Sequence, residues 1–201
     1  ASEATSDQSH RVLNQGHFKD ELGRNIYINK SIVSRNVLLL LQGPIGKRQT
    51  GEYCTVGDDS YLRVWSYSCR KQLRCVDMGT MARCCAYSDD GTMIAVGYGG
   101  RVGRGKQKQD GLIRVYTSDT FSVLFETRDS KKWVSEIKFS KDGRLLAAGT
   151  HDNSIYMYSV PQQFKRKFKF TKHNSYITHF DFSADGSVLQ SNCGGYELLF
   201  C

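Results

Sequence analysis

Hydrophobic and polar residues alternate with a period of two in three stretches of the chain. In each stretch the alternation is followed by Ser, then by Asp-Gly and a short apolar run, and the stretches cover residues 82–97, 134–149 and 177–192. Side chains of a β-strand point alternately to its two faces, and Asp-Gly suits a tight turn that needs positive φ. Each stretch therefore predicts two antiparallel strands joined by a hairpin. The apolar runs end in a small residue, such as Ala148 or Gly149, which predicts a close approach of neighbouring backbones.

A second pattern, a polar turn followed by a short strand that closes on an aromatic residue, accompanies these stretches. The closing aromatics are Trp65, Tyr116, Tyr158 and Phe200, at intervals of 51, 42 and 42 residues. A repeat of about 40 to 45 residues that holds four short strands is typical of a β-propeller blade. We therefore predict an all-β propeller with strands a to d in each blade. Strand c should end at the closing aromatic, and residues 81–201 should contain no helix longer than about three turns.

The repeats divide the chain into a tail and a propeller arc. We predict a tail or linker at 1–34, in which Ile26–Ile28 supplies the last strand of a preceding blade, and a partial propeller at 35–201. Its blades are expected at about 36–76, 81–127, 133–171 and 176–201, the first with strand a at Asn36–Leu41 and the last without strand d. Blade faces are buried by neighbouring blades, so about four blades predict an arc of a larger ring.

Longer runs carry a resemblance to one family. Phe139–Tyr158, His173–Ser183 and the run Ser-Asn-Cys-Gly-Gly-Tyr-Glu-Leu-Leu-Phe at 191–200 resemble the echinoderm microtubule-associated protein-like family of WD-repeat propellers, and the resemblance covers 50–201. It implies a non-catalytic scaffold that binds tubulin or microtubules and associated proteins, without cofactor, small-molecule substrate or membrane. It also implies a place in the cytoplasm, on the microtubule cytoskeleton or the ciliary axoneme.

The sequence departs from this family's pattern at several positions. It has no Trp-Asp dipeptide, since Trp65 is followed by Ser66. Gly195 stands where the family usually has Asp, and Cys201 where it often has Trp. We therefore expect the WD hydrogen-bond relay to be incomplete, with His173 lacking its carboxylate partner.

The charge balance indicates an acidic partner. The chain has 28 Lys and Arg against 20 Asp and Glu, a net charge of +8; nucleic acid, anionic lipid and acidic protein tails all fit. An insertion at 98–109 adds a basic loop between strands b and c of the second blade. In WD propellers the b-to-c and d-to-a loops emerge on one face, which predicts a partner-binding set facing the acidic surface of tubulin. The predicted set is Arg101, Arg104, Lys106, Lys108, Lys131, Lys132 and Lys172.

Alternatives for the basic loop are a nucleic-acid contact, a general protein-interaction surface, or a solvated loop without a partner. Tyr98 is the one aromatic residue at 98–109, so the loop offers a single ring on which a nucleic-acid base could stack. Residues 100–106 match Gly-x-x-x-x-Gly-Lys, but Gln107 stands where a phosphate-binding loop needs Ser or Thr. A phosphate-binding loop also leads from a strand into a helix, whereas the basic loop is predicted to join one strand to another.

The sequence offers little support for a catalytic site or a metal site. The seven cysteines form no C-x-x-C pair, so we predict free thiols, no metal site and a reducing, cytosolic compartment. Cys84 and Cys85 should point to opposite faces of one strand. The five histidines and the turn residues Asp58, Asp59 and Asp152 are predicted to be structural, and no clustered titratable groups are found. The longest apolar run, Val37–Leu41, is far shorter than the about 20 residues of a membrane-spanning helix.

Overall fold

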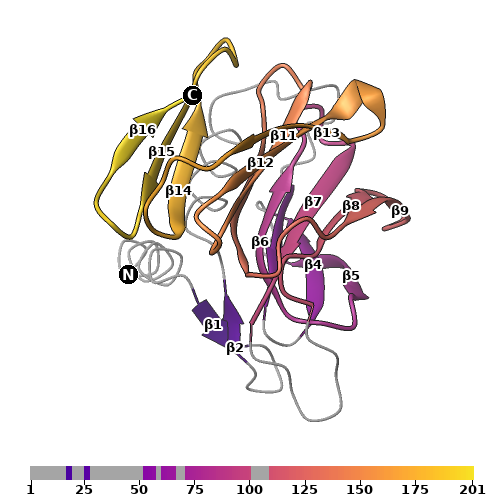
Figure 1. Ribbon diagram of the computed structural model, residues 1–201. Coiled ribbons are helices and arrows are strands. Elements are labelled where there is room, and N and C mark those ends of the chain that lie inside the picture. Colours follow the sequence, from indigo (N-terminus) through magenta and orange to yellow (C-terminus); the bar gives the residue numbers. More distant parts are fainter. Residues whose placement is uncertain (1–16, 20–24, 28–51, 58–59, 67–70, 101–108) are drawn as a thin grey trace, which may run out of the picture.

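The computed structural model describes the backbone of 17–19 and 25–27 and the residues 52–57, 60–66, 71–100 and 109–201 (Figure 1). The strands are β1 (His17–Lys19), β2 (Asn25–Tyr27), β3 (Glu52–Val56), β4 (Tyr61–Ser66), β5 (Gln72–Asp77), β6 (Ala82–Tyr87), β7 (Met93–Tyr98), β8 (Ile113–Thr117), β9 (Val123–Thr127), β10 (Val134–Phe139), β11 (Leu145–Thr150), β12 (Ile155–Ser159), β13 (Lys165–Phe170), β14 (Ile177–Phe182), β15 (Leu189–Cys193) and β16 (Leu198–Phe200). One short 3-10 helix, η1, covers Val160–Gln162. Within these described ranges no helix is long and apolar enough to cross a membrane.

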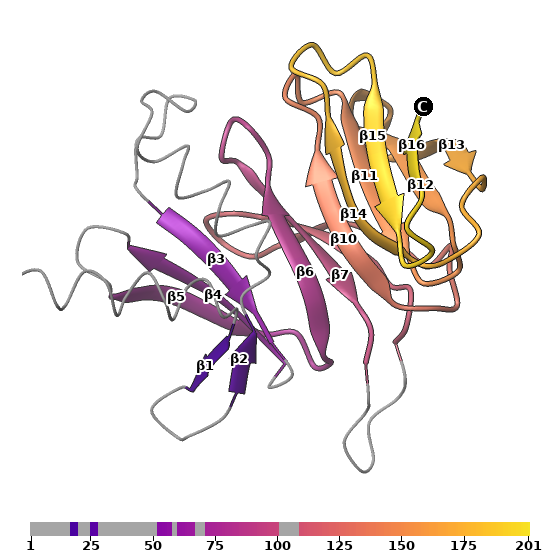
Figure 2. The same cartoon turned by 90° about the vertical axis from the view of Figure 1, so that its left-hand side faces the viewer.

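The sheets are the blades of a propeller arc. Strands β6–β9 and β10–β13 form two four-stranded antiparallel meanders, and β3–β5 and β14–β16 form three-stranded sheets. Their inner strands β6, β10 and β14 lie side by side (Figure 2). The predicted all-β propeller arc is confirmed, whereas the predicted bounds of its blades stay predictions. The predicted strand a of the first blade, Asn36–Leu41, lies outside the described residues.

Strand c was predicted to end at an aromatic residue, and the prediction holds to within one position. Strands β4, β8 and β12 each run one residue past Trp65, Tyr116 and Tyr158, and β16 ends at Phe200. Tyr116 and Tyr158 are buried, whereas Phe200 is 62% exposed. This difference follows from position, since β16 is an edge strand of its sheet.

Near the N-terminus, Asn25–Tyr27 pairs with His17–Lys19 in a two-stranded antiparallel sheet. Ile26 therefore lies in a strand, as expected. Its assignment to a preceding blade, and the boundary at 34, stay predictions.

The Asp-Gly hairpins form through hydrogen bonds that lie within each turn. In the third blade the Ser140 hydroxyl donates to Asp142 at 2.5 Å, the Arg144 amide donates to the same carboxylate at 3.0 Å, and Gly143 has a φ of 71°. The hydrogen bond from Ser140, followed by that from the Arg144 amide, lowers the pKa of Asp142. The same arrangement recurs at 88–92 and 183–187, which confirms the predicted turn.

Small residues at the ends of strands b let the next blade pack closely. A Cβ on Gly97 would lie 2.5 Å from Val134 Cγ1, and one on Gly149 would lie 2.6 Å from Ile177 Cγ2. The neighbour that approaches is thus a side chain of the following strand a, rather than the backbone that the sequence suggested. This repeated fit sets the spacing between blades.

The vicinal cysteines confirm the predicted alternation. Cys85 belongs to the core between the first two blades, and Cys84 to the core between the second and third. Desolvation by burial raises the pKa of both thiols well above its ordinary value. Cys85 Sγ also lies 3.5 Å from Cys54 Sγ, a neighbour that its sequence position does not reveal. The prediction of seven free thiols stays a prediction, because Cys69 lies outside the described residues.

Candidate functional site

The b-to-c and d-to-a loops lie at one edge of the arc. In the third blade, strand a starts where strand b ends, since Val134 pairs with Thr150, and the His151 amide donates to the Trp133 carbonyl at 2.9 Å. The loop between β7 and β8 reaches the same edge, because the Arg128 guanidinium donates to the Asp110 carbonyl at 2.9 Å. The ends of the basic insertion therefore contact the d-to-a loop at 128–133.

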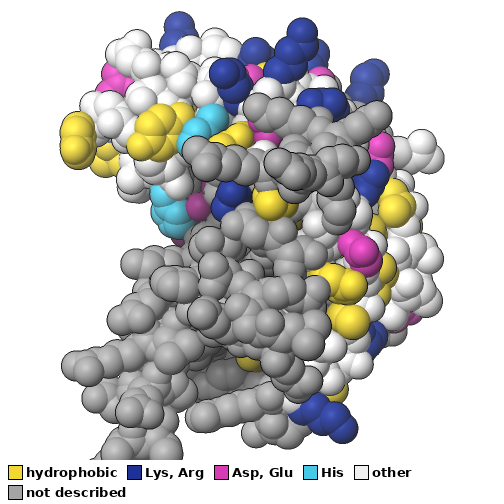
Figure 3. Space-filling view, turned by 90° about the horizontal axis from the view of Figure 1, so that it is seen from below, with side chains coloured by type: hydrophobic (Ala, Val, Ile, Leu, Met, Phe, Trp, Pro, Cys, Tyr) yellow, Lys and Arg dark blue, Asp and Glu magenta, His cyan; other side chains and the backbone are white. Residues whose placement is uncertain are grey.

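Three of the seven predicted partner-binding residues can be placed. Lys131, Lys132 and Lys172 are exposed, and all three lie in d-to-a loops at this edge. Arg101, Arg104, Lys106 and Lys108 lie outside the described residues. In the view of Figure 3, Lys and Arg side chains gather along the upper part of the face. The insertion does join two paired strands, as predicted, and not a strand and a helix.

Two carboxylates close in sequence to these cations, Asp110 and Asp129, are engaged in structural contacts. Asp129 lies 2.6 Å from Arg166 Nη1 and accepts a hydrogen bond from the Tyr158 hydroxyl at 2.8 Å. Asp110 is buried, and its side chain accepts a hydrogen bond from the Gly100 amide at 3.0 Å. Both carboxylates thus have partners of their own in this part of the fold.

A second basic surface was missed by the sequence analysis. Strand β13 is the outer edge of the third blade, and four of its six residues are exposed cations, Lys165, Arg166, Lys167 and Lys169. The signal was present in the run Lys-Arg-Lys-Phe-Lys-Phe. Lysine on an edge strand opposes pairing with another sheet, which supplies a structural reason for this charge.

An aromatic row joins three loops of the candidate face. The ring of His151 lies between Trp133 and Tyr176, with centroid distances of 5.2 and 4.7 Å. The guanidinium of Arg83 lies over Trp133 at 5.1 Å. The row connects the second, third and fourth blades, so His151 has the structural role that its position predicted.

We expect this row to make stability depend on pH. Desolvation, and then the positive charge of Arg83, lower the pKa of His151, against an opposing effect of Asp110. The unfolded chain thus binds the proton more readily, so stability contributed by neutral His151 is complete above about pH 6.5 and falls as the pH drops below it, by at most about 1.4 kcal/mol per pH unit. Melting temperatures between pH 5 and 8 should show a smaller slope for His151→Phe than for the wild type. An unchanged slope would contradict this origin.

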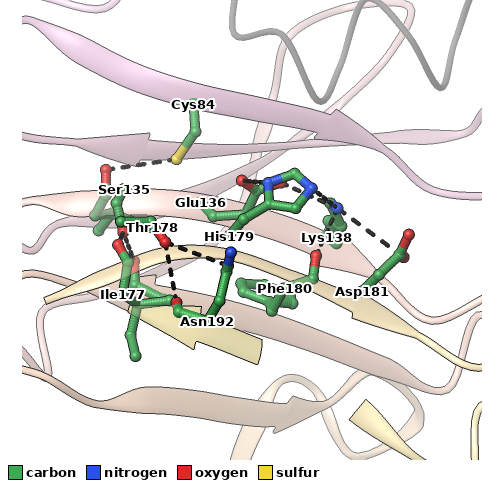
Figure 4. A network of polar contacts seen from close by, with 12 residues as sticks. Cys84, Ser135, Glu136, Lys138, Ile177, Thr178, His179, Phe180, Asp181 and Asn192 are labelled. Atoms are coloured by element: carbon green, nitrogen blue, oxygen red, sulfur yellow. Dashed lines mark hydrogen bonds and ion pairs between the residues drawn. The ribbon is translucent and has the colours of Figure 1, made fainter. Parts of the chain in front are cut away.

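Titratable groups do cluster between the third and fourth blades, contrary to the sequence analysis (Figure 4). Glu136 and Lys138 on β10 are buried, with a distance of 3.2 Å between Glu136 Oε1 and Lys138 Nζ. His179 Nδ1 on β14 lies 2.8 Å from Glu136 Oε2, and Asp181 lies 3.9 Å from Lys138. Sequence alternation could not reveal this group, because its members come from two repeats about 40 residues apart.

The contacts of this cluster join the two inner strands. Lys138 Nζ donates to the Phe180 carbonyl at 2.6 Å, and the Ser135 hydroxyl donates to the Ile177 carbonyl at 2.6 Å. In Figure 4 these side chains bridge the ribbons of β10 and β14. The arrangement therefore holds the fourth blade against the third.

His173 makes no hydrogen bond to a carboxylate, as expected, but the Glu197 carboxylate lies close to its ring. His173 Nδ1 lies 3.6 Å from Glu197 Oε2, and its Nε2 is 2.7 Å from the Ser191 hydroxyl. Gly195 removes the usual carboxylate, but the tight turn before β16 brings Glu197 into its place. The ring is buried and the Glu197 side chain is partly buried.

Comparison with known proteins finds one matching family and several similar proteins. The family described as "Echinoderm microtubule-associated protein second beta-propeller" matches residues 46–201. Human "Echinoderm microtubule-associated protein-like 2" is 30% identical over 207 residues, which are 94% of this chain and 30% of the relative. The "77 kDa echinoderm microtubule-associated protein" of Strongylocentrotus purpuratus is 35% identical over 155 residues, covering 75% of this chain and 21% of the relative.

A ciliate protein is also similar. The "Ciliary WD repeat-containing protein ctxp80" of Euplotoides octocarinatus is 32% identical over 161 residues, which are 74% of this chain and 22% of that protein. The chain thus spans less than a third of the length of each of these three relatives.

Proposed function

Because this chain belongs to the echinoderm microtubule-associated protein family, within its second β-propeller, we propose that it is part of a non-catalytic WD-repeat scaffold. The scaffold binds tubulin or microtubules and associated proteins, in the cytoplasm and on the microtubule cytoskeleton or the ciliary axoneme. The names of the relatives support this, since two are called microtubule-associated and one ciliary. Residues 35–201 form the propeller part and 1–34 a tail or linker.

The observation that carries the proposal is the basic edge of the arc. Lys131 and Lys132 lie on a loop that contacts the ends of the basic insertion, and Lys172 lies on the next d-to-a loop. Such a face attracts acidic protein tails through fields that are screened over about 8 Å at physiological salt. Single exposed ion pairs contribute about 0 to 1 kcal/mol, so affinity depends on their sum.

Neutralising Arg101, Arg104, Lys106 and Lys108 to Gln is expected to weaken microtubule binding about tenfold. Four exposed pairs of a fraction of a kcal/mol each sum to about 1.4 kcal/mol, which is a factor of ten. The loss should be larger at low salt, and the melting temperature should stay unchanged. Co-sedimentation with microtubules at two ionic strengths measures the effect. A variant that pellets like the wild type would place the contact elsewhere.

Two triple variants test where the face lies. Lys131, Lys132 and Lys172 changed together to Gln should weaken co-sedimentation, because these lysines share the candidate edge. The matched control changes Lys141, Lys165 and Lys167 to Gln and so removes the same charge from exposed positions away from this edge. Lys141 lies in the hairpin turn between β10 and β11, and Lys165 and Lys167 lie on β13. Equal losses in both would show that net charge, and not this edge, governs binding.

A further inference from the structure

Three potential metal ligands meet at the start of the last blade. His173 lies in the loop before β14, Cys193 ends β15, and Glu197 precedes β16. Their ligand atoms all lie within 4.8 Å of one another, and His173 and Cys193 are buried. The sequence concealed this group, because its members are 20 and 4 residues apart and form no C-x-x-C or His-x-His spacing.

The two separations from the Glu197 carboxylate are close to the edges of a metal tetrahedron. Glu197 Oε2 lies 3.6 Å from His173 Nδ1 and 3.3 Å from Cys193 Sγ. With zinc bonds of about 2.0 to 2.1 Å to nitrogen or oxygen and about 2.3 Å to sulfur, a tetrahedral site has ligand-to-ligand edges of about 3.4 to 3.6 Å. All three ligand atoms lie within 4.8 Å of one another, so one ion can reach them once the His173 and Cys193 side chains adjust to it.

The nitrogen that faces the cluster has no hydrogen-bond partner. His173 Nδ1 is buried and unpaired, and at 3.6 Å from the carboxylate it is beyond hydrogen-bond distance. The other ring nitrogen, Nε2, is 2.7 Å from the buried Ser191 hydroxyl. A ring that donates from Nε2 directs the lone pair of Nδ1 at the cluster, which is how metal-binding histidines are commonly oriented.

The remaining ligands also have supporting contacts. The Gly195 amide donates to Cys193 Sγ at 3.4 Å, and the Cys193 thiol donates to Glu197 Oε2 at 3.3 Å. The Asn174 amide donates to Glu197 Oε2 at 2.9 Å, and its side chain donates to Oε1. These two hydrogen bonds hold the Glu197 carboxylate in place beside the other two side chains.

We propose that His173, Cys193 and Glu197 bind a divalent transition metal of the zinc type. Imidazole nitrogen, thiolate and carboxylate together suit Zn²⁺, and a hard ion such as Mg²⁺ prefers oxygen ligands alone. The fourth position of the tetrahedron is open to water. The ion joins the d-to-a loop to β15 and to the turn before β16, three segments that the hydrogen-bond relay also links.

Titration of the full chain with Co²⁺, a spectroscopic stand-in for Zn²⁺, tests the proposal. The wild type should bind one equivalent with a sulfur-to-cobalt charge-transfer band, and added Zn²⁺ should abolish the band. Cys193→Ser should lose the band, and His173→Gln should bind Co²⁺ more weakly. Ser191→Ala should keep the band with about 10- to 100-fold lower affinity, the usual cost of losing a group that orients a ligand.

The exposed thiols provide the matched control. Cys201→Ser and Cys75→Ser each remove an exposed cysteine that does not belong to the cluster. Both variants should leave the charge-transfer band and the Co²⁺ affinity unchanged. Circular dichroism in metal-free buffer shows whether each variant folds. If Cys193→Ser does not fold, the metal site is tested instead by the Co²⁺ affinities of His173→Gln and Ser191→Ala, which should both be lower than that of the wild type. Absence of the band in the wild type, or a band that survives in folded Cys193→Ser, would overturn the metal site and leave a hydrogen-bond relay.

Discussion

Replacing Gly111 with alanine is expected to lower the free energy of unfolding by more than about 3 kcal/mol. Gly111 has a φ of +80°, where a side chain costs about 1 to 2 kcal/mol. A Cβ there would also lie 1.9 Å from the Ser130 carbonyl oxygen and 2.5 Å from its carbon. These are backbone atoms, so the loop before β10 must move and its contacts with the insertion are lost. Equilibrium unfolding in urea measures the loss.

Gly79→Ala is the matched control. Gly79 has a φ of +73°, but a Cβ there would meet no atom within 4 Å. Its substitution should therefore cost the backbone strain alone, about 1 to 2 kcal/mol. Equal losses for the two variants would show that the loop before β10 yields freely and that the contact at Gly111 does not constrain the blades.

Lys138→Met is expected to destabilise the chain by about 3 to 5 kcal/mol. The Glu136 carboxylate is 2% exposed, and Lys138 supplies the positive charge 3.2 Å from it. Removing Lys138 takes the cation away from a desolvated carboxylate, which then keeps only the contact with the His179 ring at 2.8 Å among the residues that the structure describes. The Phe180 carbonyl, which accepts a hydrogen bond from Lys138, loses that donor as well. Chemical denaturation at pH 7 should show the loss.

A double-mutant cycle separates the pair from its surroundings. Lys138→Met combined with Glu136→Leu removes both charges, and apolar replacements of a buried pair are often close to neutral. The double variant should therefore be more stable than Lys138→Met alone. Asp181→Asn should cost less than about 1 kcal/mol, because this carboxylate is 52% exposed and 3.9 Å from Lys138. Additive losses in the cycle would contradict the coupling of Glu136 with Lys138.

Much of the fold follows from chemistry between residues close in the chain. The hairpin at Ser140, Asp142 and Gly143 needs only a positive φ and hydrogen bonds within the turn, so its three copies could be recognised from residue types. The period of two likewise separated Cys84 from Cys85. The order of strands within a blade was predictable for the same reason, because each described sheet is a meander of strands adjacent in sequence.

The candidate sites depend on contacts between repeats. Alternation tells which side chains point inward, but not which residue of the next blade each one meets. The pair of Glu136 with His179 arises only when blades stack, and Glu197 reaches His173 only through the turn before β16. Such pairs are fixed by packing of the blades, because many partners are equally compatible with the pattern of any single strand. Local hydrogen bonding and side-chain alternation thus determine each blade, while close packing between blades decides which polar groups come together.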